Sequence, residues 1–239
     1  MDTPNEQKIR HLTTDEIKKG CVEISGDDAM GARICRINEE LEQGMTSMEA
    51  YTHSVTFYGS ARFREGHPYY EKARNLAYRL AKELDVTVTT GGGLGIMEAG
   101  NRGAFEAGGK SLGLSIELPN EQTTNKYLTD QVPFYFFFAR KVTLSFSATT
   151  FIFFPGGYGT LDEFFEAITL VQTKKIDQVP IVLFGSDFWK PLETFIHKVL
   201  LEQFATISPT DPDLFVITDD PDVVIATVKN AKPRMHTID

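Results

Sequence analysis

Two glycine-rich segments are the strongest chemical signals in the sequence, because each lies between an apolar run and an amphipathic stretch. The first follows Thr89-Thr90, and the second follows Phe151–Phe154. Glycine permits positive φ angles and lets bare backbone N–H groups approach an anion at the positive end of a helix. Since open α/β sheets bind ligands at the carboxyl ends of their strands, we expect both loops to face one crevice and to bind a phosphate group. The glycines of this expected site are Gly91, Gly92, Gly93, Gly95, Gly156, Gly157 and Gly159.

Two other interpretations of the first loop stay open. A dinucleotide fingerprint would have a small residue where Glu98 stands, but Glu117 supplies an acid at the end of the next strand, as that function needs. The other alternative is a tight strand-to-helix turn without a ligand, although four glycines in five positions exceed what a turn requires.

Polar side chains near these loops could complete an anion site. Arg140-Lys141 follow the aromatic run Phe134–Phe138, and Gly59-Ser60 follow the first apolar run. The arginine and lysine are either ordinary surface charges or ligands for an anionic substrate, which a planar guanidinium can bind through two hydrogen bonds. Gly59 and Ser60 either contribute to the same crevice or form a plain loop.

Asp162 and Glu163 follow the second glycine loop, at the start of the next expected helix. Thr160 can cap that helix through its hydroxyl, and a carboxylate in a first turn is favoured by the helix dipole. Because successive helical residues differ by about 100° in direction, one acid can face the crevice while its neighbour faces away. The five histidines are scattered, and no Walker lysine, serine elbow or HExxH motif occurs, so acid–base chemistry falls to carboxylates.

The pattern around these motifs predicts an α/β fold, a Rossmann-like parallel sheet with helices on both faces. Six strands are expected at Val55–Tyr58, Val86–Thr90, Ser111–Glu117, Thr150–Phe154, Pro180–Phe184 and Leu214–Ile217. Helices are expected at Pro68–Leu84, Ile96–Ala107, Lys141–Ser147, Leu161–Gln172, Phe188–Phe204 and Asp222–Asn230.

The chain is expected to divide into a helical extension over residues 1–50, a nucleotide-binding catalytic domain over 51–232 and a flexible tail over 233–239. The extension contains helical segments at Thr14–Lys19 and Asp27–Gln43, closed by Gly44, and packs on the main domain or on a partner subunit.

The net charge of −9 argues against binding to nucleic-acid polymers or to anionic membranes. The apolar runs are too short to cross a bilayer, and Cys21 and Cys35 form no disulfide framework or zinc motif. We expect a cytoplasmic protein without a metal or cofactor. The aromatic run predicts a homo-oligomer.

The sequence resembles the Lonely Guy (LOG) family of cytokinin-activating phosphoribohydrolases, long labelled lysine decarboxylases, and in particular its larger type II bacterial branch. The resemblance extends from about residue 55 to about residue 184 and rests on the first glycine loop with Met97 and Ala99, on Arg140-Lys141, and on Pro155-Gly-Gly-x-Gly-Thr160-x-x-Glu163. A polar pair of the plant pattern is replaced by Phe138-Ala139.

What the resemblance implies is hydrolysis of the N-glycosidic bond of a nucleoside 5′-monophosphate, such as AMP or a cytokinin riboside monophosphate, to a free base and ribose 5-phosphate. It also implies that Arg140 and Glu163 are catalytic. Further positions that it assigns to the nucleotide site are Met97, Glu121, Lys141, Gly156, Gly157, Tyr158, Gly159, Thr160 and Thr169. A carrier of a nucleotide or of a molybdenum cofactor is the alternative function, and pyridoxal-phosphate decarboxylation is a third, for which no lysine stands in a suitable context.

Overall fold

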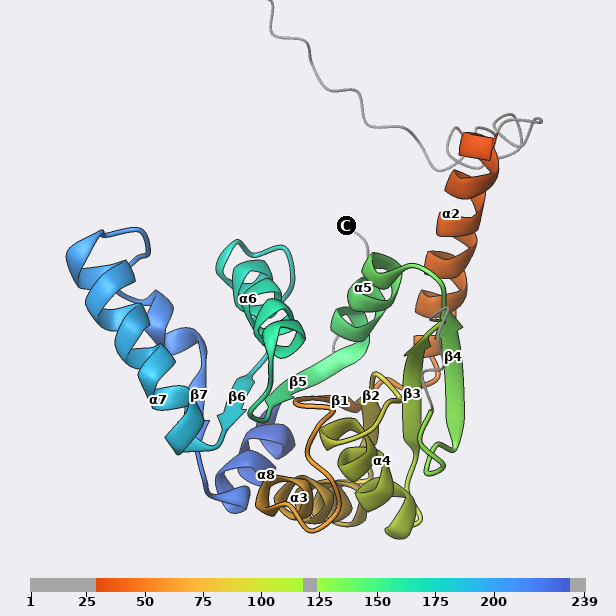
Figure 1. The fold of residues 1–239 in the computed structure, drawn as a ribbon, viewed down its shortest axis with the longest axis horizontal. Coiled ribbons are helices and arrows are strands. Elements are labelled where there is room, and N and C mark those ends of the chain that lie inside the picture. The colour runs from red at the N-terminus through yellow and green to blue at the C-terminus, as the bar shows by residue number, and fades with distance from the viewer. Residues whose placement is uncertain (1–28, 118–123, 233–239) are drawn as a thin grey trace, which may run out of the picture.

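The computed structural model describes residues 29–117 and 124–232, which form a parallel β-sheet covered by helices on both faces (Figure 1). The sheet has seven strands in the order β4-β3-β2-β1-β5-β6-β7, and each neighbouring pair is parallel. The strands are β1 (Ser54–Tyr58), β2 (Thr87–Thr90), β3 (Ser111–Ile116), β4 (Asp130–Phe134), β5 (Ala148–Phe153), β6 (Ile181–Phe184) and β7 (Val216–Thr218). The predicted Rossmann-like α/β fold is therefore confirmed.

The helices form one layer on each face of the sheet. One layer holds α3 (Pro68–Leu84), α4 (Ile96–Glu106) and α8 (Pro221–Asn230), and the other holds α2 (Ala29–Met48), α5 (Phe137–Ser147), α6 (Tyr158–Gln172) and α7 (Ser186–Phe195). The apolar side chains of each layer form a separate core against the sheet. Five strands are buried along their whole length because helices cover both faces. Their buried positions hold serine and threonine as well as apolar residues, and only β6 is apolar throughout.

The strand order reverses between β1 and β5. From β1 the chain moves through β2 and β3 to β4 at one edge, and it then returns to β5 on the other side of β1. The carboxyl ends of β1 and β5 therefore lie at the switch point of the sheet, where open α/β sheets have their ligand crevice.

The predicted count of six strands is wrong, because no strand was predicted at β4, which ends at Phe134, the first residue of the aromatic run. Pro133 occupies β4 and cannot donate a backbone hydrogen bond. It is tolerated there because β4 is an edge strand and pairs with β3 alone.

Several helix boundaries also differ from the predicted ones. Helix α5 begins four residues before Lys141, and α6 begins at Tyr158, so Gly157 is the N-cap residue and Thr160 lies inside the helix. The predicted capping role of Thr160 is therefore wrong, and Asp162 and Glu163 lie beyond the first turn. The single helix predicted over Phe188–Phe204 is α7 followed by a π-helix, η1 (Ile196–Gln203), and a short 3₁₀ helix, η2 (Asp211–Leu214), precedes β7.

Helix α2 packs against α5 and β4, so this part of the N-terminal extension lies on the main domain. Gly44, predicted to end the helix, lies within it. A Cβ atom at Gly44 would lie 2.6 Å from Thr143 Oγ1 and 2.8 Å from Phe134 Cζ. The glycine therefore serves close packing of α2 on α5. The predicted helix Thr14–Lys19 and the predicted tail 233–239 lie outside the described residues. None of the described helices is both long and apolar enough to span a bilayer.

A substitution at Gly44 tests this packing. Replacing glycine by alanine inside a helix ordinarily stabilises it by roughly 1 kcal/mol. Because the added methyl group collides with Thr143 and Phe134, we expect Gly44→Ala instead to lower the Tm by roughly 3–10 °C, as overpacking does. Gln43→Ala, at an exposed neighbouring position, is the control and should leave the Tm nearly unchanged. A higher Tm for Gly44→Ala in a thermal unfolding experiment would contradict the packing.

Candidate functional site

A cavity of about 700 Å³ opens at the carboxyl ends of β1, β2 and β5, at the switch point of the sheet. It collects side chains and backbone from all three loops that the sequence indicated and from the first turn of α5. The predicted site residues that line it are Gly59, Ser60, Gly91, Met97, Arg140, Gly156, Gly157, Tyr158, Gly159, Thr160 and Glu163.

Backbone hydrogen bonds join the three loops. The Ser60 N–H donates to the Pro155 carbonyl over 3.0 Å, and the Ile96 N–H donates to the Ser60 carbonyl over 3.0 Å. Gly95 has a φ of +71°, and a Cβ atom there would collide with the Ser60 carbonyl and the backbone of Ala61. The loop after β1 therefore fixes the two glycine loops relative to each other.

Gly91 lets the site arginine approach the end of β2. A Cβ atom at Gly91 would lie 2.9 Å from Met97 Sδ and 3.1 Å from Arg140 Nη1. Any larger residue would push the guanidinium or the methionine into the cavity. The glycine at this position therefore provides room for side chains of the site.

Arg140 and Glu163 face each other in the cavity. Arg140 Nη2 lies 4.0 Å from Glu163 Oε1, and the two side chains are only 11% and 19% exposed. Arg140 Nε is buried, with no hydrogen-bond partner among the described residues. Burial lowers the pKa of Arg140, against the opposing effect of Glu163, but an arginine stays charged at neutral pH. A buried guanidinium with an unused N–H donor is suited to bind the negatively charged group of a ligand.

Glu163 is the acid that faces the cavity, while its neighbour Asp162 faces Lys141. Burial raises the pKa of Glu163 to about 7, and the charges of Arg140 and Lys141 only partly oppose that rise. A carboxyl group with this pKa exchanges a proton near neutral pH, which is the property of a general acid or base.

The second glycine loop leads into the N-terminus of α6. Gly157 is the N-cap residue and has no side chain to accept a bond from the first-turn N–H groups. Gly156 packs tightly against the Thr160 side chain, where a Cβ atom would collide with it. This end of α6 thus presents backbone donors and the positive end of the helix dipole beside the cavity.

The first glycine loop is held mainly by contacts within the protein. Gly92 N–H donates to Thr90 Oγ1 over 2.8 Å, and Asn125 Nδ2 donates to the carbonyls of Gly92 and Gly93 over 3.1 and 3.0 Å. Gly92, Gly93 and Gly95 do not line the cavity. The structure therefore indicates that they shape the loop, whereas Gly91 lies at the cavity wall.

Three other predicted site residues lie elsewhere. The Lys141 ammonium binds Asp162 Oδ2 at 2.7 Å and Glu166 Oε2 at 3.2 Å, both on α6. Thr169 is exposed, and its hydroxyl donates to the Phe165 carbonyl of its own helix over 2.6 Å. Glu121 lies outside the described residues. Glu117, the acid that the dinucleotide interpretation needs, lies 3.9 Å from Arg36 and does not line the cavity.

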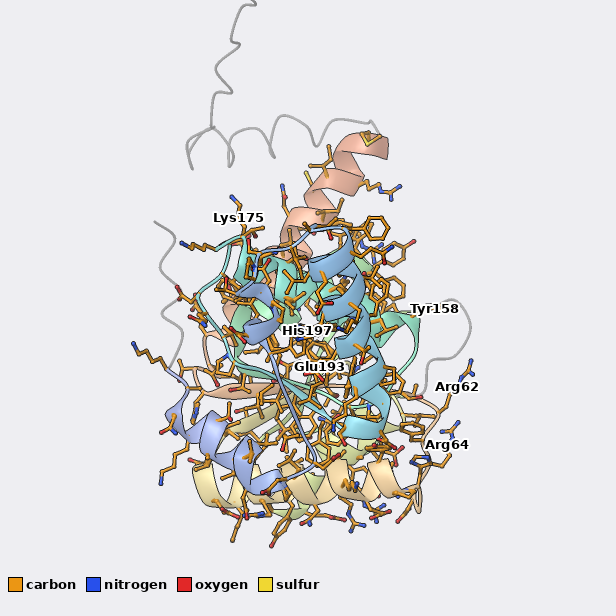
Figure 2. The ribbon with its side chains drawn as sticks, turned by 90° about the vertical axis from the view of Figure 1, so that its left-hand side faces the viewer. Arg62, Arg64, Tyr158, Lys175, Glu193 and His197 are labelled. Carbon is orange, nitrogen blue, oxygen red and sulfur yellow. The ribbon has the colours of Figure 1, made fainter. Side chains whose placement is uncertain are left out.

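Aromatic walls are the part of the site that the motifs did not indicate. The cavity wall includes five aromatic side chains besides Tyr158: Phe57, Tyr58, Phe63, Phe137 and Phe188. The fold brings these side chains together from strand ends, loops and helix starts. In the sequence, only the aromatic run Phe134–Phe138 pointed to an aromatic wall. Figure 2 shows Tyr158 projecting outward on the same side of the molecule as Arg62 and Arg64. Tyr158 and Arg62 also line the cavity, so they form part of its rim.

The described parts of the chain, 29–117 and 124–232, hold no group of three or more histidine, cysteine, aspartate or glutamate side chains that could share a metal ion. The residues that line the cavity offer two arginines, Arg62 and Arg140, a carboxyl group of raised pKa, backbone donors and aromatic surfaces.

Curated proteins of known activity are similar to this chain in sequence. The chain is 29% identical to the cytokinin riboside 5′-monophosphate phosphoribohydrolase LOG5 of Arabidopsis thaliana, over 69% of this chain and 72% of that protein. It is 25% identical to the cytokinin riboside 5′-monophosphate phosphoribohydrolase of Rhodococcoides fascians, over 74% of this chain and 89% of that protein.

A solved structure supports the fold assignment. The molybdenum cofactor carrier protein of Chlamydomonas reinhardtii superposes with a TM-score of 0.57 and 23% identity, over 74% of this chain and 96% of that chain. A family model described as "Possible lysine decarboxylase" matches residues 97–228, more than half of the sequence. Together with the phosphoribohydrolase relatives, this match shows that the chain belongs to the LOG family.

Proposed function

We propose that this protein hydrolyses the N-glycosidic bond of a nucleoside 5′-monophosphate and releases the free base and ribose 5-phosphate. The observation that carries the proposal is the pair formed by Arg140 and Glu163 in a cavity bordered by the glycine loops. The phosphoribohydrolase relatives act on a substrate of this class by their names. A cavity of about 700 Å³ also lies within the range of small-molecule sites.

The 5′-phosphate binds at the second glycine loop and beside Arg140. A phosphate monoester carries roughly −1.5 to −2 charge at pH 7, and a helix N-terminus and a guanidinium are suited to such an anion. Binding of this remote group holds the sugar in a fixed place, so that its interaction energy can be used to position the reacting bond.

Glu163 acts at the anomeric carbon. As the bond from C1′ to the base nitrogen breaks, the ribose gains positive charge, which a carboxylate stabilises. The same carboxylate takes a proton from water while the water oxygen bonds to C1′, and the leaving base nitrogen gains a proton in exchange. Water is thereby divided between the two products, and no oxidant or cofactor is consumed.

The aromatic walls bind the base by stacking. Phe137 and Phe188 come from the starts of α5 and α7, and Tyr158 stands at the rim with 93% of its surface exposed. Ring faces accept any planar base, so adenine and a cytokinin base are both compatible with this wall. We propose AMP or a cytokinin riboside monophosphate as the substrate.

A carrier of a nucleotide or of a molybdenum cofactor is the second candidate function. The likeness to the carrier of Chlamydomonas reinhardtii supports it at the level of fold. The buried acid beside the cavity favours hydrolysis, since a carrier needs no group that exchanges protons near neutral pH. Incubation with a panel of nucleoside mono-, di- and triphosphates and the matching nucleosides separates the two functions. Release of ribose 5-phosphate from monophosphates supports the enzyme, and tight binding without turnover supports the carrier.

Pyridoxal-phosphate decarboxylation, the activity that the family description suggests, has no support in this site. The residues that line the described cavity include no lysine, and Lys141 is paired with two carboxylates outside it. Hydrolysis, in contrast, needs an anion-binding group and an acid–base group, and Arg140 and Glu163 supply these in the cavity.

We also propose that copies of this chain associate through the outer face of α2 and α5. Large apolar side chains are exposed on these two neighbouring helices, among them Met30 (61%), Phe138 (47%) and Val142 (41%). Phe137, which lines the cavity, belongs to the same helix and is 54% exposed. Exposed apolar surface of this kind marks a protein–protein contact.

Glu163→Gln tests the catalytic acid. The substitution keeps the size of the side chain but removes the charge and the ability to take a proton, so we expect kcat to fall by about 10²–10⁴-fold. The Kd for AMP should change little, because the phosphate is bound elsewhere. Asp162→Asn is the matched control, since this neighbouring acid faces Lys141, and its kcat should stay close to that of the unmodified protein. Full activity of Glu163→Gln would remove Glu163 from the mechanism.

The pH dependence tests the ionised form of Glu163. A general base must be deprotonated, and burial raises the pKa of Glu163 to about 7. We therefore expect kcat/KM to rise through pH 7 and to fall by about tenfold per pH unit well below it. Steady-state rates of ribose 5-phosphate release measure this profile. The outcome that contradicts an ionised Glu163 is a rate that stays constant or increases as the pH is lowered from 8 to 6.

Val142→Asp tests the association face. A charge in the middle of an apolar contact is costly, so the substitution should shift the protein toward monomers in light scattering coupled to size-exclusion chromatography. Lys175→Asp, a charge change in the loop after α6, is the control and should leave the mass unchanged. A monomeric unmodified protein, or an oligomer that Val142→Asp leaves intact, would contradict this face as the contact.

A further inference from the structure

The start of helix α5 is held by a residue from the N-terminal extension. The N-cap residue of α5 is Phe136, which has no side-chain acceptor for the N–H groups at this end. Glu40 of α2 supplies one. Its Oε1 accepts a hydrogen bond from the Tyr135 N–H over 3.1 Å, and its Oε2 accepts one from the Phe136 N–H over 3.0 Å.

Two further contacts keep Glu40 in this place. Its side chain is 12% exposed, and Arg36 Nε lies 3.6 Å from its Oε1, one helical turn away. The Arg36 guanidinium also lies over the Tyr135 ring, 4.0 Å from its centre. The carboxylate is thus oriented by α2 and set against the segment that leads into α5. A negative charge at this position is also favoured by the dipole of α5.

The packing of α2 supports the same arrangement further along α5. Gly44 lies against Thr143, whose hydroxyl donates to the Ala139 carbonyl over 2.9 Å. Helix α2 therefore contacts α5 in its second turn as well as just before its first turn. Among these contacts of α2, the hydrogen bonds to Glu40 are the ones that hold the backbone leading into α5.

The first turn of α5 carries the site arginine. Phe137 and Arg140 both line the cavity, and the Arg140 N–H donates to the Phe136 carbonyl over 3.2 Å. The amide that Glu40 binds and the carbonyl that Arg140 binds thus belong to the same residue, Phe136. A shift of this residue moves the backbone from which the Arg140 guanidinium extends into the cavity.

We propose that Glu40 is a positioning residue for Arg140, so that helix α2 is a working part of the nucleotide site. Glu40 does not line the cavity and acts through the start of α5. The role assigned to Arg140 in binding the phosphate rests on the proposed function. The position of the α5 start does not depend on it, which allows the two to be tested separately.

A double-mutant cycle on AMP binding tests the proposal. The four proteins carry Glu163→Gln to stop turnover, either alone or with Glu40→Gln, Arg140→Ala or both. Loss of a helix cap typically costs enough to change an equilibrium by about 3–10-fold, so Glu40→Gln should raise the Kd for AMP by that factor in calorimetric titrations. With Arg140→Ala present, Glu40→Gln should change the Kd by less than about 2-fold, because the residue through which it acts is gone.

The same calorimetric titrations with AMP provide the control and can contradict the proposal. Glu39→Gln, an exposed neighbour on α2, should leave the Kd for AMP unchanged. Glu40→Gln without an effect on the Kd would overturn the proposal. An effect of equal size in the Arg140→Ala background would also overturn it, because it would show a general loss of structure.

Amide hydrogen exchange separates this proposal from the proposed function. Without nucleotide, Glu40→Gln should accelerate exchange at the start of α5, including the Arg140 N–H, and leave α3 and α4 unchanged. If the Glu163→Gln parent binds neither AMP nor a cytokinin riboside monophosphate, the proposed function fails. Accelerated exchange confined to the start of α5 would still support the positioning role of Glu40. Exchange that is unchanged there would overturn it.

Discussion

The candidate site depends on one interaction, the approach of Arg140 to Glu163 inside a largely buried crevice. Separated by 4.0 Å, the two side chains do not form a tight hydrogen-bonded salt bridge, and Arg140 Nε has no partner among the described residues. Burial makes both charges costly, and that cost is visible in the raised pKa of Glu163. A phosphate group that binds Arg140 would supply a second negative partner for the guanidinium, and the sugar would then extend along the cavity toward the acid. The pair is thus arranged for a ligand beside the two groups.

The surrounding structure holds the Arg140 and Glu163 side chains at the wall of the cavity, where a ligand can reach them. Arg140 comes from α5 and Glu163 from α6, while the loop after β1 links both glycine loops through backbone bonds at Ser60. The topology places these segments together because the strand order reverses between β1 and β5. Small residues then allow these segments to approach each other closely. Gly91 leaves room for the Arg140 guanidinium, and Gly95 leaves room for the Ser60 carbonyl. Several glycines of the two loops therefore shape the site by their small size, in addition to any contact with a ligand.

The sequence was informative where a local pattern has a direct physical meaning. Two glycine loops between strands and helices predicted the crevice, and the 100° step between Asp162 and Glu163 predicted that only one of them faces it. It was less informative where packing decides. Glycine often ends a helix, but Gly44 lies inside α2 and allows close packing on α5. Strand β4 was not predicted because proline is rare in strands, although an edge strand can accommodate Pro133. Glu40 offered no local signal, since its partners lie about 95 residues away in the chain.

The positions of Lys141 and Thr169 show the same distinction. Both were predicted to line the nucleotide site, yet Lys141 is paired with acids of α6 and Thr169 binds its own helix. A sequence motif gives the type of residue at a position. The contacts that this residue makes depend on the whole fold. Their roles toward a nucleotide stay predictions.

The most direct test of the central claim is a crystal structure of the Glu163→Gln protein with bound AMP. We expect the phosphate to lie against residues 156–160 and Arg140, with C1′ of the ribose within about 4 Å of the side chain at position 163. A phosphate bound elsewhere, or a side chain at position 163 turned away from C1′, would contradict it.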